Sequence, residues 1–451
     1  MFNAAIEPHC PDSPSATDAR NYDADKRRAR RQEENASGRI EDVPEYRQLL
    51  LQRRIVDSMG FRNPYFRRIE KAGGGVATIG DRTYANFSTY DYLDLNSSPE
   101  VAEAVVSAVG RYGCSAGGSR AVSGERAPTR ELEEALANFL GYPDCLAFVS
   151  GYLANASLLP HLFGKNDLIA LDALSHNSLI AGAVHSGAGR FFFPHNDMNA
   201  LDRFLTESRD RFDRALIAAE GLYGMDGTIG DLPGLLKLKK RHRCFLMLDE
   251  AHSLGVLGAE GRGATEHFGV DPSEIDINMG TLSKVLCGCG GYVCGSAELI
   301  HYLRYTAPGF LYSVGLSPLL AAASRAALGI LKREPGRVAR LRNLSRRFLE
   351  RARTAGLDVG QAAGEGVVPV FVGNSMAAAL TADRLFSEGI NVLPMIHPVV
   401  PEGAARIRFF FSSAHQEEQL DEAVTALCGA IDGARGEAER LVEEGRWDFG
   451  T

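Results

Sequence analysis

The main pattern along the chain is a series of short segments in which almost every residue is apolar. Longer stretches with apolar residues at helical spacing separate most of them. Strands that are apolar throughout, without alternation, are typical of a sheet covered by helices on both faces. The pattern therefore predicts an α/β fold with a mainly parallel sheet, with strands at 145–149, 168–171, 215–219, 244–248 and 275–279.

The helical stretches carry their own start signals. Thr129 is expected to cap a helix, and acidic residues follow it in the first turn, where they complement the helix dipole. Leu132, Leu136 and Phe139 then fall on one face of that helix. A long helix is expected over 320–355, leading into a smaller α+β unit with strands at 366–372 and 406–411 and a helix at 375–388.

These patterns divide the chain into five parts. Residues 1–45 are polar and are expected to be a flexible leader, because they cannot bury enough apolar surface to fold. The basic cluster inside this leader is interpreted as a solvated tail, with docking to a carrier protein or nucleic acid as the alternative. The other parts are an N-terminal arm (46–95), a large domain (96–335), a small C-terminal domain (336–435) and a C-terminal tail (436–451). In the arm, the aromatic residues from 84 to 93 are interpreted as strand-like.

Composition supports a globular protein and argues against nucleic acid or a membrane as its partner. A chain of 451 residues with 45% hydrophobic and 24% charged residues is ordinary for two packed units. A net charge of −8 gives no general attraction to nucleic acid or anionic membranes. The sequence contains no run of 18 or more apolar residues, so no integral membrane segment is expected. The eight scattered cysteines fit a reducing cytoplasm, and their one cluster lacks zinc spacing, so no metal site is expected.

Polar side chains follow the predicted strands at the points where the strands end. In open parallel sheets, ligands bind at the carboxyl ends of the strands. At one of these ends a Ser-Gly turn precedes a helix, within FVSGYLAN (148–155), and such a turn offers backbone N–H groups to an anion. The polar residues at these ends are Ser150, Tyr152, Glu220, Asp249 and Thr281.

Lys284 gives these strand ends a specific chemistry. It lies in GTLSKVLCGCGG (280–291), just after a predicted strand, while a second strand ends in LDEAHSLG (248–255). A lysine amine can carry an aldehyde cofactor as a Schiff base, and a pyridine ring becomes an electron sink beside a fixed carboxylate such as Asp249. With the hydroxyls of Thr281 and Ser283 next to Lys284, the pattern favours pyridoxal 5'-phosphate as the cofactor.

Two histidines and two arginines are further candidates. His252 can hydrogen-bond the phenolic oxygen of the cofactor, and His176 could lie flat on its ring, although a lone histidine is more often structural. Arg406 and Arg408 lie on a predicted strand, where we expect them to face opposite sides. One of the two would bind a substrate carboxylate through its planar guanidinium, and the other would be solvated or structural.

Five separated motifs together resemble those of the α-oxoamine synthases. This family of fold-type-I pyridoxal phosphate enzymes includes serine palmitoyltransferase, 8-amino-7-oxononanoate synthase, aminolevulinate synthase and ketobutyrate-glycine ligase. The resemblance covers about residues 46–435 in family order, and it implies a seven-stranded, mainly parallel sheet in a cofactor-binding large domain and a homodimer with a shared active site. The motifs are GGSRAVSG (117–124), Ser-His-x-Ser (175–178), LDEAHSLGVLGAEGRG (248–263), GTLSK with its trailing Gly-Gly (280–291) and RIRFFFSSAH (406–415).

Carried over by motif, the resemblance implies a role for each candidate residue. Lys284 binds the cofactor covalently and removes the α-proton of the substrate. Arg408 binds the amino-acid carboxylate, and Asp91 lies in the substrate site. The implied cofactor contacts are Asp249 at the pyridine nitrogen, His252 at the phenolic oxygen, His176 on the ring, Glu220 beside them, and Ser150, Gly151, Tyr152, Thr281 and Ser283 at the phosphate, with Ser313 from the second subunit.

The sequence departs from the family pattern at two places. The family usually has Ser before the Met of EGLYGMDG (220–227), where this chain has Gly224, so one cofactor hydrogen bond is expected to be missing or supplied by water. The family's Asn-Tyr-Leu-Gly motif reads Asp-Tyr-Leu-Asp at 91–94. This second change lies near the expected entrance for the amino acid and the thioester, so it bears on substrate choice.

The expected activity is a decarboxylating Claisen condensation. A small amino acid (serine, alanine or glycine) would react with an acyl thioester, either acyl-CoA or an acyl carrier protein, to give an α-aminoketone for lipid or secondary-metabolite biosynthesis. LDEAHSLG and ATEHFGVDP (264–272) look nearer to serine palmitoyltransferase than to the glycine-using members. The alternatives are another fold-type-I activity, such as an aldolase or aminotransferase, and a non-catalytic subunit of a heterodimer, although such subunits lose the lysine.

Overall fold

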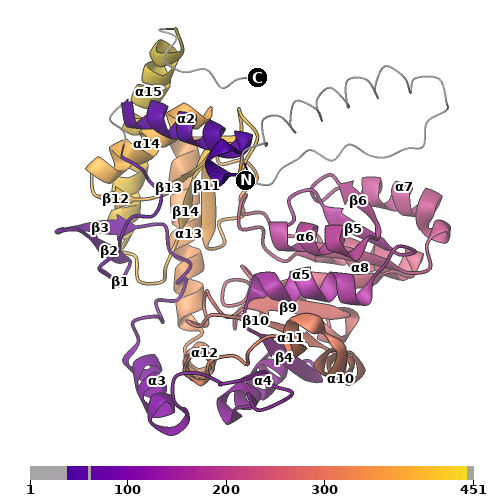
Figure 1. Cartoon of the computed structure of the whole chain (residues 1–451). Coiled ribbons are helices and arrows are strands. Elements are labelled where there is room, and N and C mark those ends of the chain that lie inside the picture. Colours follow the sequence, from indigo (N-terminus) through magenta and orange to yellow (C-terminus); the bar gives the residue numbers. More distant parts are fainter. Residues whose placement is uncertain (1–37, 59–61, 444–451) are drawn as a thin grey trace, which may run out of the picture.

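A computed structural model describes residues 38–58 and 62–443 of the chain. The part of the predicted flexible leader before residue 38 lies outside the described residues. Figure 1 shows a large unit built around one sheet and a smaller unit that contains the C-terminal helices.

The large unit contains the predicted sheet. Its strand order is β4-β10-β9-β8-β7-β5-β6, with β10 antiparallel to both neighbours and the other pairings parallel. This confirms the α/β class and the mainly parallel, seven-stranded sheet, and the five strands predicted from apolar runs lie within two residues of their observed bounds. The strands are β4 (Asp144–Phe148), β5 (Leu168–Asp172), β6 (Gly189–Phe193), β7 (Ala215–Glu220), β8 (Phe245–Asp249), β9 (Ile277–Thr281) and β10 (Gly291–Gly295).

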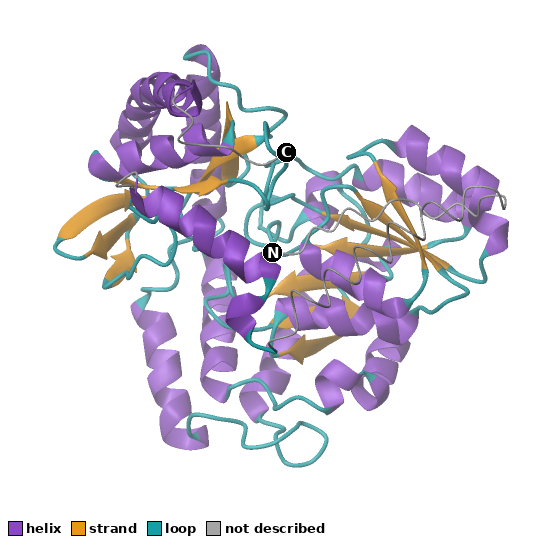
Figure 2. Cartoon of the chain, turned by 45° about the horizontal axis from the view of Figure 1, so that its top comes forward, coloured by secondary structure: helices purple, strands orange, loops and turns teal. Residues whose placement is uncertain are grey.

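The central strands β5, β7 and β8 are apolar up to their last residue because helices cover both faces of the sheet (Figure 2). In β7, Leu216 and Ala218 belong to the hydrophobic cluster that includes helix α5 (Gly151–Leu162). Ala215 and Ile217, which alternate with them, belong to the cluster on the other face. A fully buried leucine or isoleucine side chain contributes roughly 1.5–3 kcal/mol, so neither face can be exposed without a large loss of stability.

Two predicted helices have different bounds in the structure. Helix α4 begins at Ala127, not at Thr129, because Pro128 fits the first turn of a helix, where its missing N–H is not needed. The single helix expected over 320–355 is two helices separated at Pro335, which has no N–H to continue the ladder. The other helices of the large unit are α3 (Pro99–Tyr112), α4 (Ala127–Leu140), α6 (Asn177–Ser186), α7 (Met198–Ser208), η2 (Arg209–Arg211), α8 (Leu232–His242), α9 (Ala264–Phe268), η3 (Pro272–Glu274), α10 (Ala297–Thr306), α11 (Pro308–Leu311) and α12 (Pro318–Arg333).

The small unit has the expected α+β composition. Its antiparallel sheet has the order β11-β14-β13, and helix α15 continues to Glu443, so the described part of the predicted tail is helical. The elements are α13 (Gly336–Thr354), β11 (Val367–Gly373), α14 (Ser375–Ser387), β12 (Ile390–Asn391), β13 (Leu393–Met395), β14 (Ala405–Phe410) and α15 (Glu417–Glu443).

The N-terminal arm joins the small unit. After η1 (Ile40–Asp42) and α2 (Pro44–Ser58), strands β1 (Lys71–Gly73), β2 (Val76–Ile79) and β3 (Arg82–Asn86) form a sheet with β12. The strand-like interpretation of the aromatic residues up to 93 is wrong beyond Asn86, where β3 ends. The irregular segment that follows buries Phe87 and Tyr92 completely. Within the described residues, no helix is long and apolar enough to cross a bilayer.

Candidate active site

The ends of three neighbouring strands bring the main candidates together. Glu220, the last residue of β7, pairs with Asp249, the last residue of β8. Asp249 in turn pairs with Met279 in β9, and Lys284 follows the end of β9. Because parallel strands end at one edge of a sheet, side chains distant in sequence face one site.

Lys284 has a modified acidity in this site. The side chain is half-buried, and its Nζ lies 5.5 Å from the centroid of the Tyr90 ring. Burial lowers the pKa of Lys284 from 10.5 to about 8, against the opposing charges of Asp249 and Glu220. A lower pKa makes the neutral amine more available, and the neutral amine is the form that condenses with an aldehyde.

Asp249 is a buried carboxylate that can accept a further charged donor. It is 4% exposed, and its oxygens accept hydrogen bonds from Asn155 Nδ2 at 2.9 Å and from the N–H of Ala251 at 2.9 Å. Among the described residues, no lysine or arginine forms an ion pair with it. A buried carboxylate without a paired cation is costly, so the protonated ring nitrogen of pyridoxal phosphate fits this position.

A chain of hydrogen bonds links Asp249 to His176. Asn155 Nδ2 also donates to Ser178 Oγ at 3.0 Å, and Ser178 Oγ lies 2.8 Å from His176 Nδ1. Burial lowers the pKa of His176, which favours the neutral imidazole. The sequence analysis missed Asn155, whose signal was a polar residue within the apolar part of helix α5.

Glu220 contacts the site by a hydrogen bond with the backbone of His176. Its Oε1 accepts a hydrogen bond of 2.7 Å from the backbone N–H of His176. Burial, together with the charge of Asp249, raises the pKa of Glu220 well above its usual value. The raised pKa favours the neutral form of Glu220, and its observed contact fixes the position of the His176 backbone.

The predicted phosphate site is assembled from a helix start and two hydroxyl groups. Ser150 is the N-cap of helix α5, and its side chain accepts a hydrogen bond from the N–H of Leu153. Thr281 Oγ1 lies 2.8 Å from Ser283 Oγ. A Cβ added to Gly151 would lie 3.2 Å from Thr281 Oγ1, so glycine keeps the space between the helix start and the hydroxyls open. Backbone N–H groups and hydroxyls in this arrangement fit a phosphate.

Arg406 and Arg408 lie on the same side of β14, and our expectation of opposite sides is wrong. Side chains two residues apart in a strand share a face, and both arginines contact the loop after β7. Arg406 is buried and forms an ion pair with Asp226, so its role is structural. Arg408 donates to Gly224 O at 2.9 Å and to Tyr90 Oη at 3.2 Å.

One donor of Arg408 is left for a ligand. Its Nε is buried and has no hydrogen-bond partner in the structure. Unpaired buried donors are rare because each costs free energy. The guanidinium also lies close enough to Lys284 to lower the pKa of that amine. A substrate carboxylate beside Lys284 would complete the hydrogen bonding of Arg408.

The two aspartates that depart from the family motif at 91–94, Asp91 and Asp94, both make local hydrogen bonds. Asp91 is buried, its carboxylate accepts from the N–H groups of Leu95 and Asn96, and burial raises its pKa to about 6. Asp94 replaces the family glycine at a left-handed position with φ of 55°, which aspartate tolerates. Its carboxylate also accepts from the N–H of Gly74 at 2.8 Å. These observed contacts stabilise the backbone turn, and the substrate role of Asp91 stays a prediction.

Two other predicted residues lie on exposed segments. Tyr152 is 49% exposed, and its hydroxyl donates to Asn177 Oδ1 at 3.2 Å. Ser313 lies in the loop between α11 and α12, flanked by the exposed side chains of Tyr312 and Val314.

Two tyrosines of the site were not identified as site residues from the sequence. Tyr92 Oη lies 2.7 Å from His252 Nδ1. Tyr90 bonds Arg408 and lies beside both Lys284 and His252. Both tyrosines were interpreted as part of a strand, whereas they belong to the irregular segment that follows β3.

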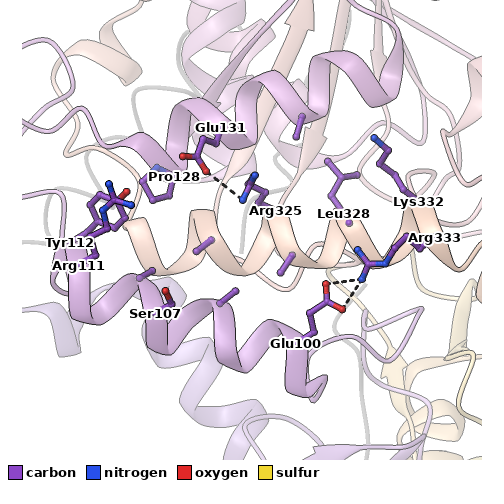
Figure 3. Close-up of a pocket in the computed structure, with 16 residues that line it drawn as sticks. Glu100, Ser107, Arg111, Tyr112, Pro128, Glu131, Arg325, Leu328, Lys332 and Arg333 are labelled. Carbon is purple, nitrogen blue, oxygen red and sulfur yellow. Dashed lines mark hydrogen bonds and ion pairs between the residues drawn. The ribbon is translucent and has the colours of Figure 1, made fainter.

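A groove between α3, α4 and α12 lies apart from this constellation (Figure 3). Its volume is about 570 Å³, and its lining includes none of the predicted site residues. Two pairs of opposite charge cross it, Glu100 with Arg333 and Glu131 with Arg325. The groove therefore has no part in the chemistry of the strand ends.

Comparisons with known proteins identify the family of the chain. Residues 82–427 match the family "Aminotransferase class I and II". The chain is 43% identical over 358 residues to a putative 8-amino-7-oxononanoate synthase of Gloeobacter violaceus, covering 78% of this chain and 90% of the relative. It is 41% identical to the 8-amino-7-oxononanoate synthase of Geobacter sulfurreducens, covering 80% and 92%. The structure is similar to that of Sphingomonas wittichii serine palmitoyltransferase, with a TM-score of 0.83, 27% identity and coverage of 87% and 98%.

The family match, over residues 82–427, contains the large unit and most of the small unit, and the predicted lysine, aspartate and histidines lie within it. The expected family and cofactor are therefore confirmed. The chain belongs to the α-oxoamine synthases, within the aminotransferase class I and II family, and is an acyltransferase-type enzyme whose cofactor is pyridoxal 5'-phosphate.

Proposed function

We propose that the protein condenses a small amino acid (serine, alanine or glycine) with an acyl thioester, acyl-CoA or acyl carrier protein, and releases carbon dioxide to give an α-aminoketone. The class of reaction follows from family membership, and the choice of substrates is our proposal. The observation that supports it most is Arg408, which has a buried donor without a hydrogen-bond partner and whose charge lowers the pKa of Lys284.

Lys284, Asp249 and Arg408 each have a separate role in this reaction. Bound pyridoxal phosphate withdraws electron density from the α-carbon of the amino acid, which makes the α-proton acidic. The amine of Lys284 accepts that proton, because burial keeps a fraction of it neutral near pH 8. Asp249 stabilises the positive charge on the ring nitrogen. Arg408 holds the carboxylate that is later lost.

The protein is proposed to act as a homodimer with a shared active site. Tyr312 is 88% exposed and Val314 is 51% exposed on the loop that carries Ser313. Exposed apolar side chains on such a loop are typical of an interface, which supports contact of Ser313 with the site of a second subunit. Light scattering should give twice the mass of one chain, and the mass of a single chain would contradict the dimer. A cytoplasmic location is part of the proposal, since the described cysteines are free thiols.

Steady-state turnover tests the choice of substrates. Glycine, alanine and serine should each be combined with short and long acyl thioesters, carried on coenzyme A and on a carrier protein. We expect one amino acid to give thiol release matched by carbon dioxide release. Amino-group transfer or aldol cleavage without thiol release would favour another fold-type-I activity. The absence of any turnover in the purified protein, with cofactor bound, would favour a non-catalytic subunit.

Asp249→Asn should slow turnover while the fold is kept. The amide cannot stabilise a positive ring nitrogen as the carboxylate does, and a hydrogen bond to a charged group contributes about 1.5–3 kcal/mol. At about tenfold in rate for each 1.36 kcal/mol, we expect turnover and α-proton exchange to fall by roughly 10- to 150-fold. Exchange can be measured by NMR in deuterated water.

Glu220→Gln is the matched control for this substitution. Because the raised pKa favours the neutral form of Glu220, the glutamine amide is its closest uncharged match, and its oxygen can keep the contact with the N–H of His176. Its loss of turnover should be much smaller than that of Asp249→Asn. Equal losses in the two variants would show that Asp249 does not act through its charge.

A further inference from the structure

The ring of His252 occupies the space that a side chain at position 224 would need. A Cβ added to Gly224 would lie 2.1 Å from His252 Nε2 and 2.5 Å from two ring carbons. The backbone angle φ of Gly224 is not positive, so glycine is required here by this close approach and not by backbone conformation. The glycine that departs from the usual family serine therefore belongs to the same local arrangement as His252.

His252 has a defined proton position in this arrangement. Its Nδ1 lies 2.7 Å from the hydroxyl of Tyr92, which is fully buried. Burial raises the pKa of Tyr92 well above 10, so the phenol keeps its proton. Among the described residues Nδ1 of His252 is the one hydrogen-bond partner of this hydroxyl, so donation to Nδ1 is the arrangement that leaves no buried O–H unpaired. Burial, with the charges of Lys284 and Arg408, lowers the pKa of His252 well below 6.5, so the imidazole is neutral. A neutral imidazole that accepts at Nδ1 must carry its proton on Nε2.

Three aromatic rings restrict any movement of this imidazole. Phe410 lies nearly parallel to it, with ring centroids 6.1 Å apart, and Tyr90 meets it edge-on at 5.8 Å. Tyr92 meets it edge-on at 6.3 Å. The backbone below the ring is also fixed, because Gly224 O accepts a hydrogen bond from Arg408. The imidazole cannot turn away from residue 224 without leaving these contacts.

We propose that Tyr92 is a positioning residue that fixes His252 as an Nε2–H donor, and that Gly224 provides the space this orientation requires. The Nε2–H group is then the donor available to the phenolic oxygen of the cofactor. This last consequence rests on the proposed role of His252, whereas the proton position and the steric relation are properties of the protein without cofactor. The serine usual in the family should therefore be harmful in this chain.

The first experiment measures the proton position directly in the cofactor-free protein. NMR of protein labelled with ¹⁵N-histidine should show His252 with an unprotonated Nδ1 and a protonated Nε2 throughout pH 5 to 8, where an ordinary histidine titrates. The His252→Gln variant assigns the signal. In Tyr92→Phe the donor is lost, and the signal should show both tautomers or begin to titrate. A proton on Nδ1 in the original protein, or an unchanged signal in Tyr92→Phe, would overturn the proposal.

Tyr65→Phe is the matched control for the loss of a tyrosine hydroxyl. Tyr65 Oη donates to Pro394 O at 3.0 Å, within contacts between the arm and the small unit. This variant should leave the His252 signal as it is. A changed His252 signal in Tyr65→Phe would mean that a general loss of stability explains the Tyr92→Phe result, which would also contradict a specific role of Tyr92.

The second experiment measures the affinity for pyridoxal phosphate. Gly224→Ser and Gly224→Ala should each raise the dissociation constant about tenfold, or about 1.4 kcal/mol, because the displaced ring loses its donor position. In the Tyr92→Phe background the same substitutions should cost much less, since the proton of His252 is no longer fixed on Nε2. Unchanged or tighter binding in the Gly224 variants, or equal costs in both backgrounds, would refute the steric coupling. Neither measurement depends on the substrates. A wrong substrate assignment would therefore leave both results unchanged and could be distinguished from a failure of this proposal.

Discussion

Replacing Lys284 with alanine should lower turnover by roughly 10²- to 10⁴-fold, the usual contribution of a general base, and remove covalent attachment of the cofactor. Borohydride reduction of the original protein should fix pyridoxal phosphate on the peptide that contains Lys284, as mass spectrometry can show. Lys165, which is exposed, provides the control, since Lys165→Ala should retain both properties. Labelling of another lysine, or normal attachment in Lys284→Ala, would contradict the assignment.

The same lysine should give the attachment reaction a distinctive pH dependence. The neutral amine is the reactive form, and burial lowers the pKa of Lys284 to about 8. The rate at which the cofactor-free protein binds pyridoxal phosphate covalently should therefore rise up to about pH 8 and then level off. An ordinary lysine, with a pKa near 10.4, would give a rate that still rises above pH 9, and that result would show that the site does not modify the amine.

Arg408→Ala should weaken binding of the amino acid far more than it changes the melting temperature. Loss of one partner from a buried charged pair costs about 2–5 kcal/mol, which corresponds to a dissociation constant raised by roughly 30-fold to several thousandfold. Arg408→Lys keeps the charge without the planar guanidinium, so an intermediate loss is expected. Spectroscopic titration with the amino acid measures both variants. Cofactor content should stay normal.

Arg406 provides the contrast, although not as a neutral control. Arg406→Ala would leave the half-buried Asp226 without its partner, and because breaking a fully buried pair costs about 3–5 kcal/mol, a smaller loss of stability is expected here. We therefore expect a lower melting temperature from Arg406→Ala, and near-normal amino-acid affinity in the protein that remains folded. If Arg406→Ala abolished binding while Arg408→Ala bound normally, the carboxylate anchor would be Arg406.

Much of the fold and the centre of the site could be predicted from the sequence because the relevant information is local. Strands covered on both faces must be apolar at every position, so the runs at 215–219 and 244–248 identify β7 and β8 without knowledge of their neighbours. The polar residues that end these strands, Glu220 and Asp249, then share one edge of a parallel sheet. The same reasoning links Asp249 with Lys284.

The expectation that Arg406 and Arg408 face opposite sides of their strand was wrong for a reason that does not involve tertiary structure. The two-residue period of a strand already places them on one face, so the sequence contained the correct answer. What the sequence did not contain was the position of the loop at 224–226 across that face. That position pairs Arg406 with Asp226 and leaves a donor of Arg408 free.

The sequence alone determined which residues could carry the chemistry, since the apolar runs and their polar ends depend on local burial and on the edge of the sheet. The tertiary structure decided how those residues are held. Tyr92 and His252 are 160 residues apart, and their hydrogen bond exists because the irregular segment after β3 packs against the end of β8. The space beside Gly224 is likewise limited by the side chain of His252, which follows the end of β8. Contacts of this kind depend on packing between distant segments, which no local pattern specifies.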